Sequence, residues 1–299
     1  YCAPGNGGIA QLSECVNIAA TDVEKIADWA KQNAMDYVVV APDDPLCLGL
    51  VDLLEAKGIP AFGPSKAAAR IEGSKVFAKR LMEDNGIPTA KCAVFDDMVK
   101  ALGYIAESPA PLVVKADGLA LGKGVIICQN RAEAAKAVRD IMERKAFGEA
   151  GSRVVIEEFL EGPEVSVLAF TDGKTIVPMV SSMDHKRALD GDKGLNTGGM
   201  GVVAPNPYYT DETAKLCMEK IFLPTVRAMN AMGAPFKGCL YFGLMLTQDG
   251  PKVIEYNCRF GDPEAQAVLP LLQSDLFSIM RHVRDGTLDH ADVRFSNGA

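Results

Sequence analysis

The chain has 299 residues, of which 48% are hydrophobic, and it carries a net charge of −8. This apolar content excludes a largely disordered chain and suffices for two or more packed cores, while the acidic pI of about 5.1 argues against a general nucleic-acid binder. No apolar run reaches the roughly 18 residues that cross a bilayer, and the first residues lack the pattern of a signal peptide.

The eight cysteines form no CxxC pair, and several lie in apolar runs. We therefore expect free thiols in a cytoplasmic protein rather than disulfides or a zinc site. Because the chain starts at Tyr1 without a methionine and ends soon after a helical pattern, we also expect a piece of a longer protein.

The first 70 residues alternate between helical and strand patterns. Thr21 and Glu24 form a capping box that predicts a helix start, and the β-branched run YVVVA is typical of a strand buried on both faces. This alternation predicts part of a doubly wound parallel sheet, whose ligands bind at the carboxyl ends of the strands. The expected elements are helices 21–34 and 46–57, strands 37–41 and 59–63, and turns 4–8 and 41–45 at the strand ends.

The remaining patterns predict an α/β and α+β multidomain chain. Residues 71–90 belong to linker helices, with one helix expected over 66–85. Short strands and two helices indicate a separate α+β module, and longer strands joined by TDG and QDG hairpin turns follow it. The expected units are 1–70, a partial α/β domain; 71–90, the linker; 91–160, the small module; 161–290, a larger subdomain with helices 211–232 and 263–285; and 291–299, the start of a truncated domain.

A glycine-rich loop follows a strand at VVKADGLALGKGV (113–125). Lys115 stands in the strand, and Gly122, Lys123 and Gly124 stand in the loop. Glycines let backbone N–H groups approach a phosphate, and lysines neutralise its charge. It is not a Walker A loop, because Gly124 stands where Ser or Thr is required. The alternative is a glycine hairpin with two solvated lysines.

The segment VVIEEFLEGPEVSV (154–167) ends a buried strand with acidic and apolar residues. The backbone beside Glu157, Phe159 and Leu160 can present N–H and C=O groups to an adenine ring, with Glu164 reaching ribose hydroxyls. The alternative is an ordinary strand end with solvated acids.

The strand VIEYNCRFGDPE (253–264) carries Glu255, Asn257 and Arg259 at alternate positions, so their side chains share one face. Hard oxygen ligands suit Mg²⁺, which takes one or two protein oxygens together with phosphates. Arg259 would stabilise charge on a transferring phosphoryl group, and Asp262 adds charge at the following turn. The alternative is a solvent-facing edge strand.

A long segment, 183–201, reads as a structureless loop, which inside a compact domain is functional or disordered. Its run Asn196, Thr197, Gly198 and Gly199 offers consecutive N–H groups that would form a nest for a carboxylate or phosphate. His185, in the same loop, receives no catalytic role. These patterns together indicate an ATP- and Mg²⁺-dependent enzyme that does not use a P-loop.

The order of these motifs resembles the ATP-grasp superfamily and, within it, the phosphoribosylamine–glycine ligase family. NTGGMG together with NCRFGDPE is highly specific to that family. The resemblance covers nearly the whole chain and implies an ATP-grasp fold, in which 91–160 is a small mobile lid and 161–290 the catalytic subdomain. The matching segments are PGN (4–6), FGPSKAAARIEGSK (62–75), VVKADGLALGKGV (113–125), EEFLEGPEVS (157–166), DHKR (184–187), NTGGMG (196–201) and VIEYNCRFGDPE (253–264).

The resemblance also implies a reaction of purine biosynthesis. ATP phosphorylates the carboxylate of glycine, and the amine of 5-phosphoribosylamine attacks the resulting glycyl phosphate to form an amide. The partners would be these small molecules, with no nucleic acid and no membrane, in a cytoplasmic monomer or weak homodimer. The implied contacts are ATP at Lys75, Lys115, Gly122, Lys123, Gly124, Glu157, Phe159, Leu160 and Glu164; Mg²⁺ or Mn²⁺ at Glu255 and Asn257; phosphoryl transfer and glycine at Arg259, Lys115 and Asp262; further substrate contacts at Asn196, Thr197, Gly198 and Gly199; and phosphoribosylamine at Gly5, Asn6 and the 43–45 turn.

One departure bears on the substrate. The family commonly has GPEAPL where this chain has APDDPL, so Asp43 keeps a carboxylate but shortens it. Three other classes stay open: another ATP-grasp ligase or carboxylase, a nucleotide-binding regulatory protein, and a Rossmann oxidoreductase favoured only by the first 70 residues. The regulatory protein would be expected to have lost Glu255, Asn257 or Arg259, and the carboxylase would use bicarbonate.

Overall fold

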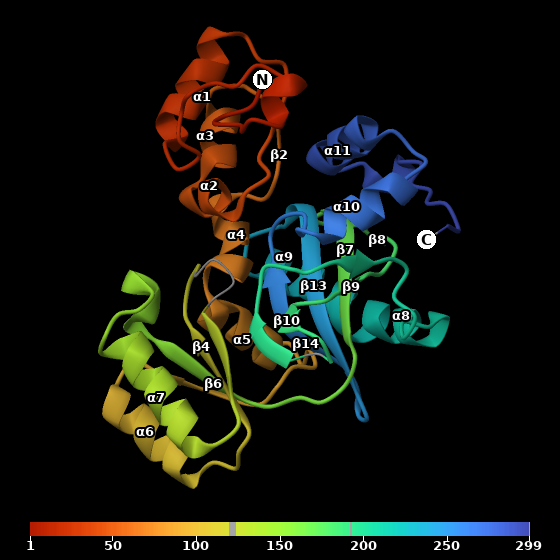
Figure 1. The fold of residues 1–299 in the computed structure, drawn as a ribbon. Helices are drawn as coiled ribbons and strands as arrows, with labels where there is room; N and C mark the ends of the chain where they lie inside the picture. Colours follow the sequence, from red (N-terminus) through yellow and green to blue (C-terminus); the bar gives the residue numbers. More distant parts are fainter. Residues whose placement is uncertain (120–123, 192, 299) are drawn as a thin grey trace.

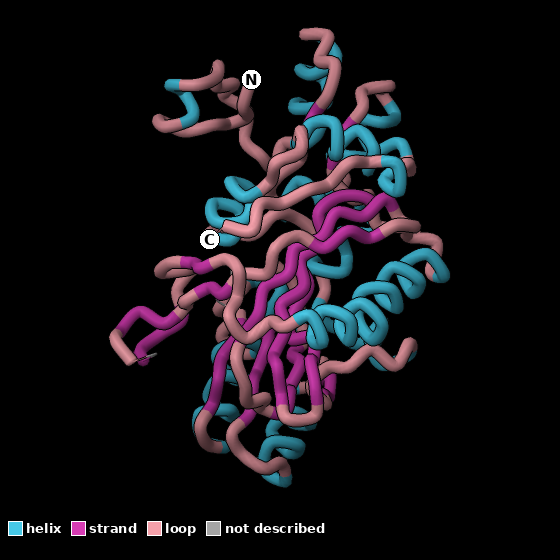
Figure 2. The backbone as a smooth tube through the Cα atoms, turned by 90° about the vertical axis from the view of Figure 1, so that its right-hand side faces the viewer, coloured by secondary structure: helices cyan, strands magenta, loops and turns pink. Residues whose placement is uncertain are grey.

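The computed structural model describes residues 1–119, 124–191 and 193–298. It has three parts (Figure 1): a helical amino-terminal part in red and orange, a yellow-green module that carries α6 and α7, and a larger part built on a central sheet. Seen after a 90° turn, the strands run through the middle of the molecule with helices around them (Figure 2). Within the described ranges, no helix is long and apolar enough to cross a membrane.

The amino-terminal part contains the predicted parallel pair of strands, and its helices differ from the prediction in detail. Thr21 does not cap the first helix, which begins after Asp22 without a side-chain cap. The single helix expected over 46–57 is two helices, separated by Gly49 at φ +96°. The elements are α1 (Val23–Gln32), β1 (Val38–Val39), α2 (Asp43–Leu48), α3 (Leu50–Ala56) and β2 (Ala61–Phe62), with β1 parallel to β2.

The linker is also two helices rather than one. Ser74 adopts an extended backbone between α4 (Lys66–Gly73) and α5 (Lys75–Asp84). The Ser74 hydroxyl accepts a hydrogen bond from the Phe77 N–H at 3.1 Å and so caps α5. The chain therefore changes direction between Glu72, at the end of α4, and Lys75, at the start of α5. Both side chains belong to the candidate site.

The small module is the predicted α+β unit, a four-stranded antiparallel sheet covered by two helices. Apolar side chains of α6 and α7 pack on one face of the sheet in a core of their own. We call this unit the lid module. Its elements are β3 (Cys92–Phe95), α6 (Met98–Glu107), β4 (Leu112–Ala116), β5 (Val125–Cys128), α7 (Arg131–Met142) and β6 (Val154–Glu158), in the sheet order β3-β6-β4-β5.

The central sheet is antiparallel, in the order β14-β13-β7-β8, and both predicted hairpin turns are confirmed. Along β13, Leu240 and Phe242 face a core shared with α5 and α9, while Cys239 and Tyr241 face a second core beneath α11. The elements are β7 (Glu164–Asp172), β8 (Ile176–Pro178), α8 (Asp211–Cys217), α9 (Leu223–Ala231), β13 (Lys237–Thr247), β14 (Gly250–Asn257), α10 (Glu264–Val268) and α11 (Leu276–Asp285).

The segment 183–201 is not the structureless loop that its composition predicted. It contains β9 (Met183–Asp184), which pairs with β12 (Val202–Val203), and the hairpin of β10 (Arg187–Leu189) and β11 (Lys193–Asn196). Pairing between these strands therefore satisfies many backbone hydrogen bonds of a segment whose glycines and charges gave no strand pattern.

Both connections of the lid module are held by the β13–β14 hairpin. On the entry side, the Val253 N–H donates to the Pro88 carbonyl at 2.8 Å, and the Thr89 hydroxyl donates to the Val253 carbonyl at 2.7 Å. On the exit side, the Leu246 N–H donates to the Pro163 carbonyl at 3.0 Å. The backbone at Gly162 approaches Leu246 so closely that a Cβ there would lie 2.1 Å from its carbonyl oxygen.

Candidate active site

A buried carboxylate and two buried lysines meet where the lid module joins α5. Glu157 at the end of β6 is 3% exposed, and its Oε2 lies 3.0 Å from the Nζ of Lys115 on β4. The Nζ of Lys79 on α5 lies 3.2 Å from Glu157 Oε1, an ionic contact rather than a hydrogen bond. Lys79 was not predicted, although it stands four residues after Lys75 and therefore on the same face of α5.

These lysines connect the lid module to the rest of the site. Lys115 donates from Nζ to the Ile254 carbonyl on β14 at 2.8 Å. Lys75 donates to the Gly118 carbonyl at 2.9 Å. Burial lowers the pKa of Lys75, against the opposing effect of Glu255. The structure thus brings together Lys75, Lys115 and Glu157, which the sequence had placed at the nucleotide.

The start of the glycine-rich loop is held by Asp117. Its Oδ1 accepts hydrogen bonds from the Ser74 hydroxyl at 2.9 Å and from the Val76 N–H at 3.1 Å, and its Oδ2 pairs with Arg153 at 2.5 Å. This side chain therefore fixes the loop at the amino-terminal end of α5. The Gly124 carbonyl accepts from the Ala116 N–H at 2.8 Å, whereas the predicted Gly122 and Lys123 lie outside the described residues.

The predicted adenine and ribose contacts follow β6. Phe159 and Leu160 are half-buried, and Glu164 at the start of β7 is exposed. The Oε2 of Glu164 lies 3.7 Å from the Nζ of Lys186. The same Lys186 Nζ lies 3.5 Å from Glu255, so Glu164 stands near one of the predicted metal residues.

Glu255 is the electrostatic centre of the site. Its Oε1 lies 3.5 Å from Lys186 Nζ, and its side chain is still 36% exposed. Lys186 lowers the pKa of Glu255, with further help from Lys115 and Lys75 and against the effect of burial. In turn, Glu255 raises the pKa of Lys186 well above its usual range. Gly243 makes room for this carboxylate, because a Cβ there would lie 2.7 Å from Glu255 Cγ.

Asn257 and Arg259 continue the same strand. The Nη2 of Arg259 donates to Asn257 Oδ1 at 3.3 Å and to Glu72 Oε1 at 3.0 Å, and its Nη1 donates to the Phe260 carbonyl at 3.1 Å. Burial alone would lower the pKa of Arg259, but the carboxylates of Glu72 and Asp43 raise it. Glu72 carried no sequence signal beyond its place three residues before Lys75.

The Thr197–Gly199 turn has a different structure from the predicted nest. The Thr197 N–H donates to the Lys186 carbonyl at 2.7 Å, and the Gly199 N–H donates to the Thr197 hydroxyl at 3.1 Å, so these N–H groups are already paired. Gly199 has φ +137°, and a Cβ there would lie 2.5 Å from Pro263 Cδ and 3.0 Å from Asp184 Oδ1. Only glycine fits at this contact.

Asp184 is the second acidic residue that the sequence analysis left without a role. Its Oδ1 is buried and has no hydrogen-bond partner. Burial, and then the nearby charge of Glu264, raises the pKa of Asp184 to about 6. Glu264 itself is buried and accepts hydrogen bonds from the hydroxyls of Ser166 at 3.2 Å and Tyr241 at 3.1 Å.

Several predicted substrate residues have mainly local contacts. Asn6 Oδ1 accepts from the N–H groups of Gly8 and Ile9, and a Cβ on Gly5 would lie 2.4 Å from the Cys15 sulfur. Asp262 is exposed and accepts from Gln266 Nε2 at 2.7 Å. Asp43, by contrast, stands close enough to Arg259 for its charge to act on that side chain. The side chain of the predicted substrate residue Asn196 lies outside the described part of the structure.

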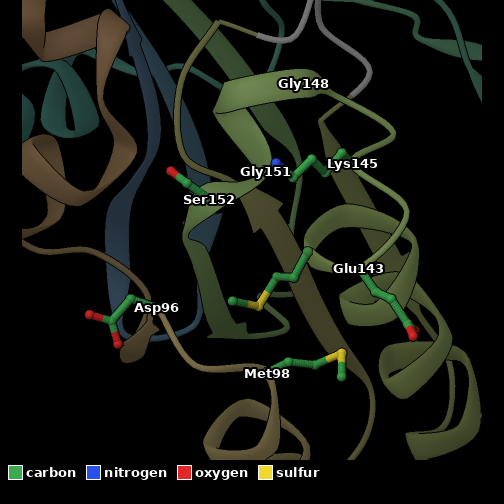
Figure 3. Close-up of a pocket in the computed structure, with 8 residues that line it drawn as sticks. Asp96, Met98, Glu143, Lys145, Gly148, Gly151 and Ser152 are labelled. Carbon is green, nitrogen blue, oxygen red and sulfur yellow. The ribbon is translucent and has the colours of Figure 1, made fainter.

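A cavity of about 310 Å³ opens in the lid module, away from the charged residues described above. Met98, Glu143, Lys145 and Ser152 are among the residues that line it (Figure 3). None of the lysines and carboxylates described above lines it. We therefore do not assign the nucleotide to this cavity.

The donor set at Glu255 and Asn257 fits a magnesium ion. No group of three or more His, Cys, Asp or Glu side chains within the described ranges is arranged to hold a metal. A carboxylate and an amide oxygen two residues apart are instead typical of an ion that takes its other ligands from phosphates and water.

All eight cysteines are free, as predicted.

The chain is similar over nearly its whole length to known proteins. The chain is 47% identical over 297 residues to the phosphoribosylamine–glycine ligase of Caldanaerobacter subterraneus, covering 99% of this chain and 71% of that protein. It is 49% identical to the ligase of Vibrio vulnificus, covering 99% and 70%. It is also 48% identical to part of the trifunctional purine biosynthetic protein adenosine-3 of Drosophila melanogaster, covering 100% and 22%.

Solved structures show the same fold. The phosphoribosylamine–glycine ligase of Thermotoga maritima superposes with a TM-score of 0.79 at 32% identity, covering 95% of this chain and 68% of that one. The biotin carboxylase domain of Hydrogenobacter thermophilus 2-oxoglutarate carboxylase reaches a TM-score of 0.72 at 18% identity, over 94% and 60%, and so shares the fold alone.

Family models divide the chain into two matched regions. Residues 1–72 match the N domain of phosphoribosylglycinamide synthetase, and residues 73–265 match its ATP-grasp domain. The boundary falls at the break between α4 and α5, where the site described above begins. With this match, the ATP-grasp fold and the relatives at nearly half identity, the chain belongs to the phosphoribosylglycinamide synthetase family.

Proposed function

We propose that this chain joins glycine to 5-phosphoribosylamine at the expense of ATP, through glycyl phosphate, in purine biosynthesis. Family membership supports the ligase reaction. The observation that carries the mechanism is the position of Lys186 3.5 Å from Glu255 Oε1. The charges of Lys115 and Lys75 also lower the pKa of Glu255, so positive charge surrounds a carboxylate that can hold a metal–phosphate complex.

The chemistry follows from the poor leaving group of a carboxylate. Transfer of the γ-phosphoryl group of ATP to the glycine carboxylate releases ADP and makes phosphate the leaving group. The amine of 5-phosphoribosylamine then attacks the carbonyl carbon, and loss of phosphate and a proton leaves the amide. The protein's task is to position the reactants and neutralise charge.

The residues divide this task. Lys75 and Lys115 hold the phosphates, and the start of the glycine-rich loop, fixed by Asp117, covers them. The backbone around Glu157, Phe159 and Leu160 receives adenine, with Glu164 toward the ribose. A Mg²⁺ or Mn²⁺ ion at Glu255 and Asn257 supplies neutralisation of the triphosphate charge. Arg259 stabilises the transferring phosphoryl group.

Asp184 gives the amino acid a second point of attachment. Glycine carries an ammonium group at neutral pH, and Asp184 Oδ1 is a buried carboxylate oxygen without a partner. We assign the ammonium group to this oxygen. The tight contact of Gly199 with Pro263 and Asp184 leaves little space beside it, which favours an amino acid without a side chain.

The test is a transfer of oxygen in the full-length enzyme. Glycine labelled with ¹⁸O in its carboxylate should deliver one labelled oxygen to the released phosphate for each amide formed. Normal amide formation with unlabelled phosphate would refute the acyl-phosphate route. ADP formation that requires bicarbonate instead of glycine would refute the ligase assignment.

We also propose that the protein works in the cytoplasm as a monomer or weak homodimer, with a lid at 91–160 and a catalytic subdomain at 161–290. The eight free cysteines support a reducing compartment. Analytical ultracentrifugation across a range of concentrations tests the association state.

A further inference from the structure

Glu72 is a buried carboxylate that the proposed mechanism does not use. It is the next-to-last residue of α4 and is 8% exposed. Both of its oxygens are occupied by the turn after β14: Oε2 accepts from the Cys258 N–H at 2.7 Å, and Oε1 accepts from Arg259 Nη2 at 3.0 Å. One side chain thus binds the backbone and the guanidinium of adjacent residues.

This arrangement limits the freedom of a long side chain. Arg259 reaches the site through several rotatable bonds, and its other hydrogen bonds run to the Phe260 carbonyl and to Asn257 Oδ1. Asn257 is also a proposed metal ligand, and its amide oxygen then serves two partners. Among these three contacts of Arg259, Glu72 is the charged one, and charge-assisted pairs are the stronger class.

Helix α4 is itself held by the amino-terminal part. The Cys47 thiol of α2 donates to the Ala69 carbonyl at 3.7 Å, and a Cβ on Gly73 would lie 3.0 Å from the Cys47 sulfur. The extended residue Ser74 then redirects the chain so that Lys75 reaches Gly118. The end of α4 therefore sends Glu72 to one side of the site while α5 sends Lys75 to the other.

We propose that Glu72 is a positioning residue that holds the Arg259 guanidinium where it stabilises the transferring phosphoryl group. This inference rests on the proposed function, because it takes Arg259 as a catalytic residue. Glu72 acts through Arg259, and the reacting atoms need not touch it. Misplacement of a group by about 1 Å can cost about 100-fold in rate, so loss of Glu72 should reduce turnover rather than substrate binding.

The first test uses Glu72→Gln in the full-length enzyme, with Glu72→Asp as a second variant. We expect kcat to fall by about 10- to 100-fold, with the KM for ATP changed by less than about threefold. Asp172→Asn is the matched control, since Asp172 is buried to 3% exposure and accepts from the Lys174, Thr175 and Leu288 N–H groups outside the site. It should affect melting temperature but not kcat.

The second test separates positioning from a merely structural role. Arg259→Ala should regain part of its activity when guanidinium is added at millimolar concentration, because Glu72 can bind the free cation. The same addition should not rescue Arg259→Ala combined with Glu72→Gln or Glu72→Asp. A folded Glu72→Gln or Glu72→Asp enzyme with wild-type kcat, or equal rescue in both backgrounds, would overturn the proposal. Wild-type enzyme that forms no amide would refute the proposed function instead.

Discussion

The two sides of the candidate site differ in how closely their buried charges are paired. On the side proposed for the nucleotide, Glu157 lies between Lys79 and Lys115, all of them buried, and Lys115 also donates to the Ile254 carbonyl. On the side proposed for the amino acid, Asp184 has a buried oxygen without a hydrogen-bond partner, and the Nζ of Lys186 lies 3.5 Å from Glu255 and 3.7 Å from Glu164.

The difference indicates what each side is built for. Paired buried charges join the lid module to α5 and contribute to the stability of the fold. Charged groups with long or missing contacts can instead bind charged groups of the substrates. We therefore expect substitutions on the nucleotide side to change stability first, and substitutions on the amino-acid side to change catalysis or binding first.

The largest expected effect is that of Glu157→Gln on stability. Removing this charge leaves Lys79 and Lys115 buried without their anion, which typically costs about 3–5 kcal/mol. The free energy of unfolding, from urea titration, should fall by that order. Glu158→Gln is the matched control. The Glu158 carboxylate stands next to Glu157 in the sequence, but it is 37% exposed and lies 3.7 Å from Lys252. Equal effects of the two substitutions would contradict the contrast between the sides.

Glu255→Gln should show the opposite pattern. Loss of the carboxylate should reduce kcat by about 100- to 1,000-fold, as removal of one charge-stabilising group does in other enzymes. The melting temperature should fall less than in Glu157→Gln, since the Glu255 side chain is 36% exposed and that of Glu157 only 3%. Asp249→Asn, in the β13–β14 turn and 85% exposed, serves as the control. Wild-type turnover of Glu255→Gln at limiting Mg²⁺ would remove the metal assignment.

A smaller effect is expected from Asp184→Asn on glycine binding. The KM for glycine should rise about tenfold, equivalent to about 1.4 kcal/mol, while the KM for ATP stays constant. The same steady-state assays in which glycine and ATP are varied in turn provide the measurement. An unchanged KM for glycine would show that the ammonium group binds elsewhere.

The smallest effect concerns pH and the same residue. The folded protein raises the pKa of Asp184 from 3.8 to about 6, so ionisation of this group costs stability as pH rises through that window. The groups that act on it are Glu264 and Glu164, which raise its pKa, and Lys186 and His185, which lower it. Without substrates, Asp184→Asn should therefore melt higher than wild type at pH 8, with a smaller difference at pH 5. A difference that grows toward pH 5 would contradict the raised pKa.

The sequence indicated which side chains lie close together where they belong to one strand or one motif, whereas their binding and catalytic roles stay predictions. Glu255, Asn257 and Arg259 alternate along β14 and its extension, and Lys115 and Glu157 lie on paired strands of the lid module, so local periodicity was enough. The ATP-grasp fold and the family were predicted by the same motifs. The mobility of the lid stays a prediction.

Residues that reach the site from distant segments were harder to predict. The sequence pattern predicts one continuous helix across Ser74, whereas the structure has a break there. The position of Glu72 beside Arg259 depends on this break and could not be predicted from the pattern. Asp184 and Lys186 stand in a segment whose strands depend on pairing with distant residues rather than on local pattern. Asn6, given a substrate role by its motif, accepts hydrogen bonds from the Gly8 and Ile9 N–H groups of a local turn, and its substrate role stays a prediction.

The way the lid module is attached bears on how freely this module can vary while the rest of the fold stays the same. Its entry at Pro88 and Thr89 and its exit at Pro163 are bonded to adjacent strands of a single hairpin. The module is therefore an insertion with neighbouring ends, and it has a core of its own. Such a unit can be shortened, replaced by a related sheet or varied in sequence while the strand order of the central sheet stays the same.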